Sequence, residues 1–232
     1  MRLIVLGLPL GNAKDISVRA LEVLKSAKVI ICEDTRVFFR LWQKLKFLGL
    51  LENNYEGKLM VINDFNEKHQ LGQVLDRIAL DGEVVLVSDA GMPTISDPGY
   101  CLLKEAVIRD WSLTVVPGPT AATSALAISG LSADRVLFVG FLPQKGVKRS
   151  KLFEGIRRTG LGMTLVIYEA PVRVRKTLLE IDGVFEKMIG EVVIARELTK
   201  EHEEVVRGDI ATLANREYKG EVVILVRLLP ND

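Results

Sequence analysis

The sequence predicts an α/β fold, because short apolar runs alternate with amphipathic stretches along the whole chain of 232 residues. The apolar runs have the length of buried strands, and the stretches between them repeat their apolar residues every three or four positions, as helices do. Strands that alternate with helices are typical of a largely parallel sheet. A second observation, a Pro-Gly-Pro turn at residues 117–119, divides the chain into two such regions.

The first region is expected to form five strands and four helices. Its clearest helix pattern places Leu71, Val74, Leu75 and Ile78 on one face. Strands are expected at 2–8, 29–32, 59–62, 83–87 and 112–116, and helices at 15–27, 35–48, 66–80 and 100–109.

The Pro-Gly-Pro turn marks the expected domain boundary, because two prolines around a glycine continue neither a strand nor a helix. We therefore expect an N-terminal α/β domain with a mostly parallel sheet over residues 1–117 and a C-terminal α/β domain over 118–232. In the second domain, strands are expected at 135–139, 163–168, 191–195, 203–206 and 221–226, and helices at 120–128, 148–158, 171–181 and 209–216.

Composition restricts the class of protein. Hydrophobic residues make up 48% of the chain and charged residues 26%, which is near the globular average. Cys32 and Cys101 lie far apart in apolar surroundings and are expected to be core thiols in a reducing compartment. His69 and His202 lie in polar surroundings without zinc spacing, so no metal is expected.

The apolar start of the chain is expected to be a buried strand, since it is too short for a membrane span and lacks the features of a signal peptide. This predicts a cytoplasmic protein with no membrane partner. The net charge is only +1, so binding to nucleic acid would have to depend on local basic patches.

The loop at residues 7–12 follows the first strand and consists mostly of small or apolar residues. A ligand can approach the backbone of such a loop at the carboxyl end of a strand. The loop lacks the G-x-G-x-x-G pattern, and Pro9 removes an amide donor, so a dinucleotide site is not supported. An ordinary strand-to-helix turn is the alternative interpretation.

Glu33, Asp34, Thr35 and Arg36 follow the second strand, so two carboxylates, a hydroxyl and a guanidinium gather where open α/β sheets bind ligands. The alternative is a simple helix start, with Asp34 or Thr35 as the N-cap. Capping would not explain Arg36, since a cation is unfavourable in the first turn of a helix.

The connection at residues 88–99 joins the fourth strand to the next helix and is twelve residues long, whereas such loops usually have about 2–6 residues. It contains Asp89 and Asp97, with hydroxyl residues, prolines and glycines around them. Asp97 and Pro98 form a good helix start, which explains the end of the loop but not its beginning. We expect a ligand-binding loop.

A basic stretch precedes one helix of the second domain. It contains Lys145, Lys148, Arg149 and Lys151 with no acidic residue among them. Because cations are unfavourable at a helix N-terminus, contact with RNA phosphates is one interpretation and a solvated helix start is the other. Under the first interpretation these four side chains point outward.

Taken together, these segments resemble the tetrapyrrole methylase superfamily. Within it, the chain is most similar to the group that methylates a cytidine ribose 2′-hydroxyl in small-subunit (16S) ribosomal RNA. The resemblance runs in order along nearly the whole chain, through residues 9–12, 33–36, 66–67, 87–100, 117–122, 140–143 and 195–200. The long Ser-Asp-Ala-Gly…Ser-Asp-Pro-Gly loop is its most specific part.

The resemblance implies two α/β domains with a cleft between them for S-adenosylmethionine, and typically a homodimer. It implies cofactor contacts, largely through the backbone, at the first loop, the loop after the fourth strand, the Pro-Gly-Pro turn and a strand end of the second domain. Carried over to this sequence, the cofactor-binding residues are Leu8, Pro9, Leu10, Met92, Ile95, Thr120, Ala121, and Tyr168 or Glu169.

The chain departs from the usual pattern in two places. Its opening loop reads Leu-Gly-Leu-Pro, where the superfamily usually has a threonine before the proline. The chain also ends just after its last expected strand, where the typical ribosomal enzyme continues with a small helical segment.

The expected reaction is transfer of a methyl group to a ribose 2′-hydroxyl of a cytidine in small-subunit ribosomal RNA or the 30S particle. A ribose hydroxyl is a weak nucleophile, so a general base would help to remove its proton. Asp34, Glu33 and Asp89 are the candidate bases, and Arg36 would hold a phosphate or polarise the hydroxyl. The alternatives are a methyltransferase for a tetrapyrrole or other small molecule, and a non-catalytic ribosome-binding relative.

Overall fold

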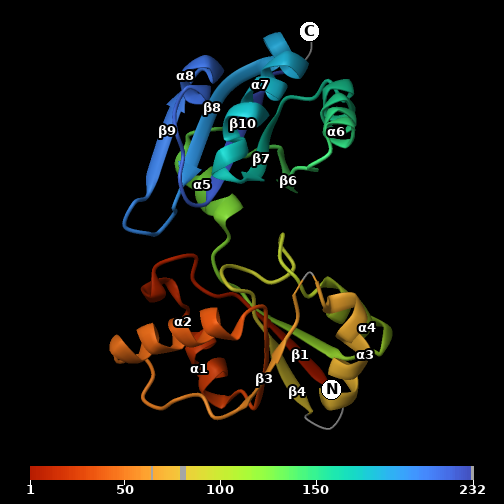
Figure 1. Ribbon diagram of the computed structural model, residues 1–232, viewed down its shortest axis with the longest axis vertical. Helices are drawn as coiled ribbons and strands as arrows, with labels where there is room; N and C mark the ends of the chain where they lie inside the picture. The colour runs from red at the N-terminus through yellow and green to blue at the C-terminus, as the bar shows by residue number, and fades with distance from the viewer. Residues whose placement is uncertain (64, 79–81, 231–232) are drawn as a thin grey trace. The chain divides into compact units, whose positions relative to one another are not determined.

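The computed structural model describes residues 1–63, 65–78 and 82–230 and divides into two compact units, Met1–Thr120 and Ala121–Asp232. Each unit contains one five-stranded sheet with helices packed against it, which confirms the predicted α/β class (Figure 1). No helix in these described residues combines the length and apolar character that a membrane crossing needs.

The sheet of the first unit is parallel throughout. It contains β1 (Arg2–Leu6), β2 (Val29–Cys32), β3 (Lys58–Val61), β4 (Glu83–Leu86) and β5 (Ser112–Val116), in the spatial order β3-β2-β4-β1-β5. Parallel neighbours need crossover connections, and the helices between the strands provide them.

The helices of the first unit cover both faces of its sheet. α1 (Val18–Ser26) and α2 (Thr35–Phe47) pack on one face, whereas α3 (Glu67–Ile78) and α4 (Tyr100–Ile108) pack on the other (Figure 1). Successive side chains of a strand point to opposite faces, so Ile30 and Cys32 pack under α1 and α2 while Val29 and Ile31 pack under α3 and α4. This two-sided burial explains why the strands are apolar runs without polar alternation.

The strand order creates a switch point between β1 and β4, which are neighbours in the sheet. The chain leaves β1 toward β2 on one side and leaves β4 toward β5 on the other. In open α/β sheets the carboxyl ends of two such strands form the usual ligand site. The loop that follows β1 and the long loop that follows β4 both begin there.

The Pro-Gly-Pro turn belongs to the first unit, whose boundary falls after Thr120 rather than after residue 117. Its glycine packs against the loop after β1, since a Cβ on Gly118 would lie 2.8 Å from the carbonyl carbon of Gly7. The N–H of Gly7 in turn donates to the carbonyl of Val116 at 3.0 Å. Backbone contact this close holds the turn on the first sheet and explains the later boundary.

The second sheet is mixed. It contains β6 (Val136–Phe141), β7 (Met163–Glu169), β8 (Ile189–Arg196), β9 (Glu204–Gly208) and β10 (Val222–Leu228), in the order β6-β7-β10-β8-β9. Only β6 and β7 are parallel; the other neighbours are antiparallel. Val222, the first residue of β10, pairs with Glu169 on one side and Arg196 on the other, so the carboxyl ends of β7 and β8 lie at the same sheet edge.

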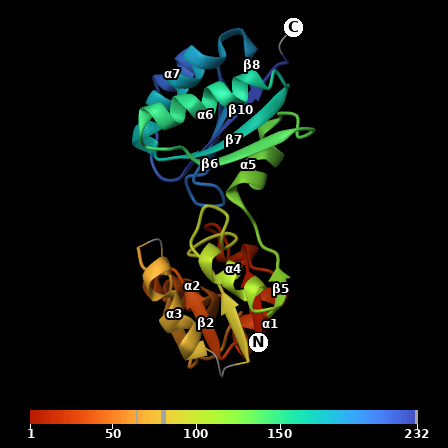
Figure 2. The same ribbon diagram turned by 90° about the vertical axis from the view of Figure 1, so that its right-hand side faces the viewer.

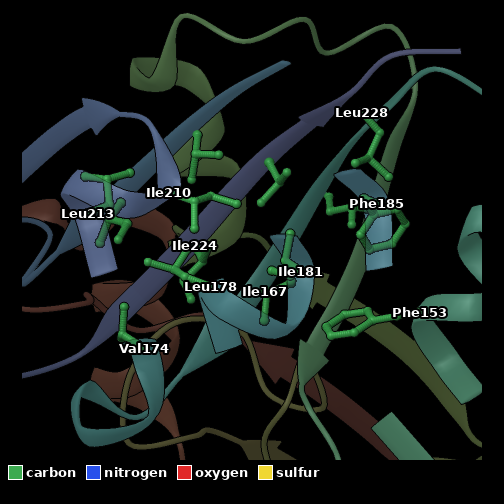
Figure 3. Close-up of a cluster of buried hydrophobic side chains, with 14 of the residues drawn as sticks. Phe153, Ile167, Val174, Leu178, Ile181, Phe185, Ile210, Leu213, Ile224 and Leu228 are labelled. Carbon is green, nitrogen blue, oxygen red and sulfur yellow. The ribbon is translucent and has the colours of Figure 1, made fainter. Parts of the chain in front are cut away.

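The main core of the second unit lies between one face of this sheet and the helices α6 (Gly146–Arg158), α7 (Val174–Phe185) and α8 (Ile210–Ala214). Figure 2 shows α6 and α7 on this face, and Figure 3 shows aliphatic side chains of β7 and β10 packed against those of α7 and α8. On the opposite face, Ala122 and Ala125 of α5 (Ala121–Ser129) pack on Val193 and Leu225.

Most expected elements appear with shifted ends. The first helix starts at Val18 because the Ser17 hydroxyl accepts a hydrogen bond from the N–H of Ala20 at 3.1 Å and caps it there. Short 3₁₀ turns at Ala13–Asp15, Pro171–Arg173 and Glu186–Met188 were not expected from the sequence. The last two residues of the helix expected at 66–80 lie outside the described residues.

We expect Gly118→Ala to lower the free energy of unfolding by about 1–3 kcal/mol, because a methyl group must push the Gly7 backbone away. Urea denaturation measures the change. Gly72→Ala in α3 is the matched control, since no atom lies within 4 Å of its Cβ position and alanine favours a helix by up to about 1 kcal/mol. Equal stability of the two variants would contradict the close contact.

Candidate functional site

The carboxyl ends of β2, β3 and β4 lie side by side. The N–H of Ile62 donates to the carbonyl of Cys32 at 3.0 Å, and the N–H of Val87 donates to that of Ile31 at 2.9 Å. Asp34 and Asp89 each lie two residues beyond this row. The structure therefore brings together two carboxylates that are 55 residues apart in the sequence, and the N–H of Asp34 donates to Asp89 Oδ1 at 3.1 Å.

Asp34 is the N-cap of α2 and is also paired with Arg36. Its Oδ1 accepts from the N–H of Arg36 at 2.8 Å, and its Oδ2 lies 2.5 Å from Arg36 Nη2. The hydrogen bonds from Arg36 lower the pKa of Asp34 from 3.8 to about 2. The helix-start interpretation is therefore confirmed for Asp34, and its negative charge explains why Arg36 is tolerated in the first turn; a ligand-binding role of the segment stays a prediction. So acidic a carboxylate is a weak base.

Asp89 has the opposite electrostatic environment. Burial raises its pKa above 3.8, and the charge of Asp34 adds to the rise, while hydrogen bonding from Asp34 N–H and the charges of Arg40 and Arg36 oppose it. Adjacent carboxylates with pKa values driven apart are a common arrangement in sites that transfer protons. Of the two, Asp89 is the better proton acceptor.

Glu33 lies between β2 and the helix cap and is half-buried. Glu33 also interacts with other groups of the protein. The neighbouring Cys32 is fully buried, and burial together with Asp89 and Asp34 raises its thiol pKa to about 12. Cys32 therefore stays protonated and is excluded as a nucleophile at neutral pH.

The loops after β1 and β4 are joined by two reciprocal backbone hydrogen bonds. The N–H of Leu8 donates to the carbonyl of Gly91 at 2.8 Å, and the N–H of Gly91 donates to that of Leu8 at 3.0 Å. The Leu8 side chain is buried in the core, as is Pro9. Leu8 therefore aligns the two loops, and its N–H is not available to a ligand. Leu10, which is half-buried, reaches the surface of this edge.

The long loop after β4 holds its side chains in a strained arrangement. Thr94 and Ser96 have φ angles of 69° and 68°, a left-handed conformation that disfavours side chains with a Cβ. Between them, Ile95 is 41% exposed, whereas the Met92 sulfur accepts from the N–H of Gly118 at 3.3 Å. Strain of this kind is frequent at ligand sites. Met92 is packed against the Pro-Gly-Pro turn, so only Ile95 is as exposed as the sequence suggests.

A buried glutamate fixes the far end of the same loop. Glu67 Oε1 accepts from the N–H of Gly99 at 3.0 Å and from that of Cys101 at 2.7 Å, where α4 begins. It supplies the capping acceptor that Gly99, as N-cap, lacks. Only the family resemblance points to residues 66–67 as part of the site, because a cap from a distant helix leaves no local pattern in the sequence.

In the second unit, Tyr168 is tied to the start of α5. Its hydroxyl accepts from the N–H of Ala122 at 2.9 Å, and its ring makes edge contacts with Phe138 and Phe141. Thr120 and Ala121 directly precede this hydrogen bond and are both half-buried. Tyr168 therefore positions the start of α5, close to the last residues of the Pro-Gly-Pro segment.

Glu169 has a structural role. It is fully buried, and its oxygens accept hydrogen bonds from Arg173 at 2.6 Å, the Thr177 hydroxyl at 2.7 Å and the N–H of Ala170 at 2.9 Å. These contacts hold the end of β7 against α7. Because the carboxylate is occupied, Tyr168 is the better of the two residues for contact with a cofactor.

The basic stretch at the start of α6 does not point outward as a whole. Lys145, Lys148 and Lys151 are exposed and, three residues apart, share one face of the helix. Arg149 is only 2% exposed and pairs with Glu180 of α7. The expectation that Arg149 contacts RNA is therefore wrong, since a carboxylate from a neighbouring helix already binds it; no local pattern in the sequence reveals that partner.

The segment after β8 forms a network of ion pairs. Glu197 accepts from Lys200 Nζ at 2.9 Å and from the N–H of Glu221 at 2.9 Å, and Arg196 pairs with Glu204 at 2.7 Å. Glu197 and Thr199 have positive φ angles, as do Thr94 and Ser96 in the long loop of the first unit. Four of the six non-glycine residues with positive φ in the described part of the chain thus fall in two of the segments that carry the family resemblance, 87–100 and 195–200.

At the first sheet's carboxyl edge, an ionised acid, a more basic carboxylate and an exposed guanidinium lie close together beside a strained apolar loop. This arrangement suits proton removal from a hydroxyl and contact with a phosphate. Within the described residues no cluster of three or more His, Cys, Asp or Glu side chains has the arrangement of a metal site.

The family model described as Tetrapyrrole (Corrin/Porphyrin) Methylases matches residues 2–214. Several curated relatives are named ribosomal RNA small subunit methyltransferase I. The protein from Thermotoga maritima is 36% identical, covering 97% of both chains, and that from a Hydrogenobaculum species is 38% identical, covering 97% of this chain and 95% of its own. The Pseudomonas aeruginosa protein is 36% identical, covering 97% of this chain and 78% of its own.

Among solved structures, uroporphyrin III C-methyl transferase from Thermus thermophilus aligns with a TM-score of 0.65 over 97% of both chains. At 17% identity, this likeness supports the fold alone. The match over residues 2–214 and the identities with full-length relatives show that the chain belongs to the tetrapyrrole (corrin/porphyrin) methylase family.

Proposed function

We propose that this chain transfers the methyl group of S-adenosylmethionine to a ribose 2′-hydroxyl of a cytidine in small-subunit ribosomal RNA. As a member of its family it is a methyltransferase that uses S-adenosylmethionine. The ribosomal substrate is supported by the relatives, whose names all specify small-subunit ribosomal RNA. The ribose hydroxyl and the cytidine are the finer part of the proposal.

The observation that supports a hydroxyl as the methyl acceptor is the pair of carboxylates at the carboxyl edge of the first sheet, whose pKa values are shifted in opposite directions. A hydroxyl must lose its proton when its oxygen is methylated, so a base at that edge is useful. Asp89, whose pKa is raised mainly by burial, is the proposed base. Its Oδ1 accepts from the N–H of Asp34, which leaves Oδ2 as the proposed proton acceptor.

Asp34 and Arg36 are proposed to position the substrate. Arg36 is 86% exposed although it pairs with Asp34, so its remaining N–H groups can reach a phosphate that flanks the target ribose. Asp34 fixes the guanidinium and orients Asp89 through its N–H. Glu33 remains a third acidic candidate, but the hydrogen bond that joins the carboxyl edge links Asp34 to Asp89.

The residues at this edge fit the cofactor. S-adenosylmethionine supplies an activated methyl group on a positively charged sulfur and has no phosphate, so it does not need the glycine-rich loop that the chain lacks. Leu10 and Ile95 offer apolar surface at this edge, since Leu10 is half-buried and Ile95 is exposed. Thr120, the last residue of the first unit, and Ala121 and Tyr168 of the second unit remain proposed contacts. The contacts of Leu8, Met92 and Glu169 give these three residues mainly structural roles.

We also propose that the protein acts in the cytoplasm on the 30S particle, and that it is a homodimer. The dimer is supported by the edge strand β6, where Val136, Leu137, Phe138 and Phe141 are all exposed. Apolar side chains gathered on one exposed edge strand are typical of a surface that a partner covers.

The test of the proposed function is incubation of the protein with labelled S-adenosylmethionine and 30S subunits that lack this methyl group, followed by mapping of the labelled nucleotide. Label on a cytidine ribose supports the proposal. Label on a nucleobase would show that the methyl acceptor is not a ribose hydroxyl. Label on a porphyrin-type substrate but not on the subunits would favour a small-molecule methyltransferase, and cofactor binding without transfer would favour a non-catalytic relative.

Asp89→Asn should reduce the single-turnover rate by roughly 10²–10⁴-fold, the usual contribution of a general base, with unchanged affinity for S-adenosylmethionine. The base is active when ionised, so the wild-type rate should fall as pH decreases through the pKa of Asp89, which is above the usual 3.8. Asp34→Asn keeps the helix cap and should cost less. A larger loss for Asp34→Asn than for Asp89→Asn would reverse the two roles.

Ile95→Asp should weaken S-adenosylmethionine binding at least about tenfold, because it places a charge on the apolar surface of the loop. Calorimetric titration measures the affinity. The matched control is Ile108→Asp at the end of α4, where the isoleucine is 66% exposed and lies away from the carboxyl edge. Equal affinities for the two variants, with normal melting temperatures, would remove the loop from the cofactor site.

Replacing Lys145, Lys148 and Lys151 with Gln should weaken binding to 30S subunits and reduce the slope of log affinity against log salt by about 0.7–0.9 for each phosphate that the variant no longer binds. Arg149→Gln should instead lower the melting temperature, because it leaves Glu180 without its buried partner, and should not change the slope. Wild-type salt dependence in the triple variant would exclude this face from RNA contact.

A further inference from the structure

The helix that starts at the candidate site carries an unbroken row of cations. Arg36, Arg40 and Lys44 are four residues apart along α2, so they share one face, and all three are exposed. α2 contains no acidic residue, although the whole chain has a net charge of only +1. Neither Arg40 nor Lys44 forms an ion pair with a carboxylate of the described residues.

A second row lies beside the first on the same side of α2. It contains Phe39, Gln43 and Phe47, again four residues apart and exposed. Phe47 is 92% exposed, so its ring is almost fully in water. Opposite this surface, Phe38, Trp42 and Leu45 bury the other side of the helix in the core. Phe39 also makes an edge contact with the buried Phe38 ring, so Phe47 is the ring that is most available to a partner.

The far end of these two rows borders a hollow. A depression of about 410 Å³ is lined by Ala13, Gln43, Lys44, Phe47 and Leu48. The surface that lines it is almost entirely apolar and includes the Phe47 ring, so the face of a base can pack there. Its volume lies within the usual range for small-ligand sites, roughly 300–1,000 Å³.

The near end of the rows is the candidate site itself. Arg36 pairs with Asp34, and Arg40 is close enough for its charge to act on Asp89. α2 has 13 residues, so the surface extends about 20 Å from the carboxyl edge of the sheet. A nucleic-acid strand with its target ribose at Asp89 would meet this helix next.

We propose that α2 is a docking surface for a single RNA strand that flanks the methylated nucleotide, with phosphates on Arg36, Arg40 and Lys44 and bases on Phe39 and Phe47. The inference rests on the proposed function, which supplies RNA as the substrate. Cations with aromatic rings between them are the usual surface for single strands, since every base has a face that can stack. Self-association through this face is disfavoured, because a twofold contact would oppose like charges.

The charge arm of the test compares two double variants. Arg40→Gln with Lys44→Gln removes two cations from the docking surface, and Arg77→Gln with Lys104→Gln removes one arginine and one lysine from exposed positions of α3 and α4, on the opposite face of the sheet. Binding of fluorescein-labelled oligouridylate is followed by anisotropy over a series of salt concentrations. The α2 variant should lose about 1.4 from the log-log slope, at about 0.7 for each phosphate bound on a single strand, and the control should lose none.

The stacking arm uses Phe47→Leu, which keeps an apolar side chain but removes the ring. It should raise the dissociation constant for oligouridylate by between about five-fold and about 150-fold, without changing the salt slope. On 30S subunits, Lys44→Gln alone, which leaves Arg40 and its effect on Asp89 in place, should raise KM and leave kcat and S-adenosylmethionine affinity unchanged. If the α2 double variant melts lower than the control, Arg40→Lys with Lys44→Arg, which keeps both charges, should restore the wild-type slope.

Equal slopes for the two double variants, or wild-type affinity in Phe47→Leu, would overturn the docking surface even if the wild-type protein methylates 30S subunits. Failure of the wild-type protein to methylate the subunits would instead reject the proposed function, while the oligouridylate comparison would still decide whether α2 binds RNA. A change in sedimentation of the α2 variant with unchanged RNA binding would assign the face to self-association and also overturn the inference.

Discussion

The two backbone hydrogen bonds between Leu8 and Gly91 are the constraint on which the candidate site depends. They join the loops after β1 and β4 at the switch point of the first sheet, where the chain leaves β1 toward one side of the sheet and leaves β4 toward the other. Gly7 and Gly118 then bring the Pro-Gly-Pro turn against the same place, closer than a side chain would allow. The long loop after β4 is thus fixed at its start by Leu8 and at its end by Glu67. Because both ends are held, Thr94 and Ser96 can keep positive φ angles, which a free loop would not maintain.

Beside this framework, one hydrogen bond makes the two acids unequal. The N–H of Asp34 donates to Asp89, so the backbone that starts α2 also orients the second carboxylate. Arg36 neutralises Asp34 locally and keeps it ionised, whereas burial gives Asp89 a higher pKa. In the proposed function, the helix cap, a structural feature in most proteins, also takes part in the proton transfer. This is why capping and function are not exclusive interpretations of the same four residues.

The sequence was sufficient for the α/β class, for nearly all helices and strands, and for the strand ends at which polar residues gather. These features follow from local periodicity and from the rule that parallel strands end at one edge. It failed where a residue's role is decided by a partner far along the chain. Arg149 reads as a surface cation until Glu180, 31 residues away, is placed against it. Leu8 likewise reads as a ligand contact, although Gly91 takes its N–H. Glu169 is a different case, because its partners Arg173 and Thr177 are only four and eight residues away, in the turn and helix that follow β7.

The small net charge of the chain is compatible with an RNA substrate because the cations are distributed unevenly. The exposed lysines of α6 lie at a helix N-terminus, where their charge is locally unfavourable, and the cations of α2 occur in a helix without acids. By contrast, Arg109, Arg149, Arg196 and Arg216 each pair with a glutamate. Pairing cancels most of the attraction that these arginines could exert on a polyanion. The electrostatic attraction of RNA is thus determined by the cations that no carboxylate neutralises within the described residues. The total charge is therefore a poor guide to where a phosphate backbone would lie.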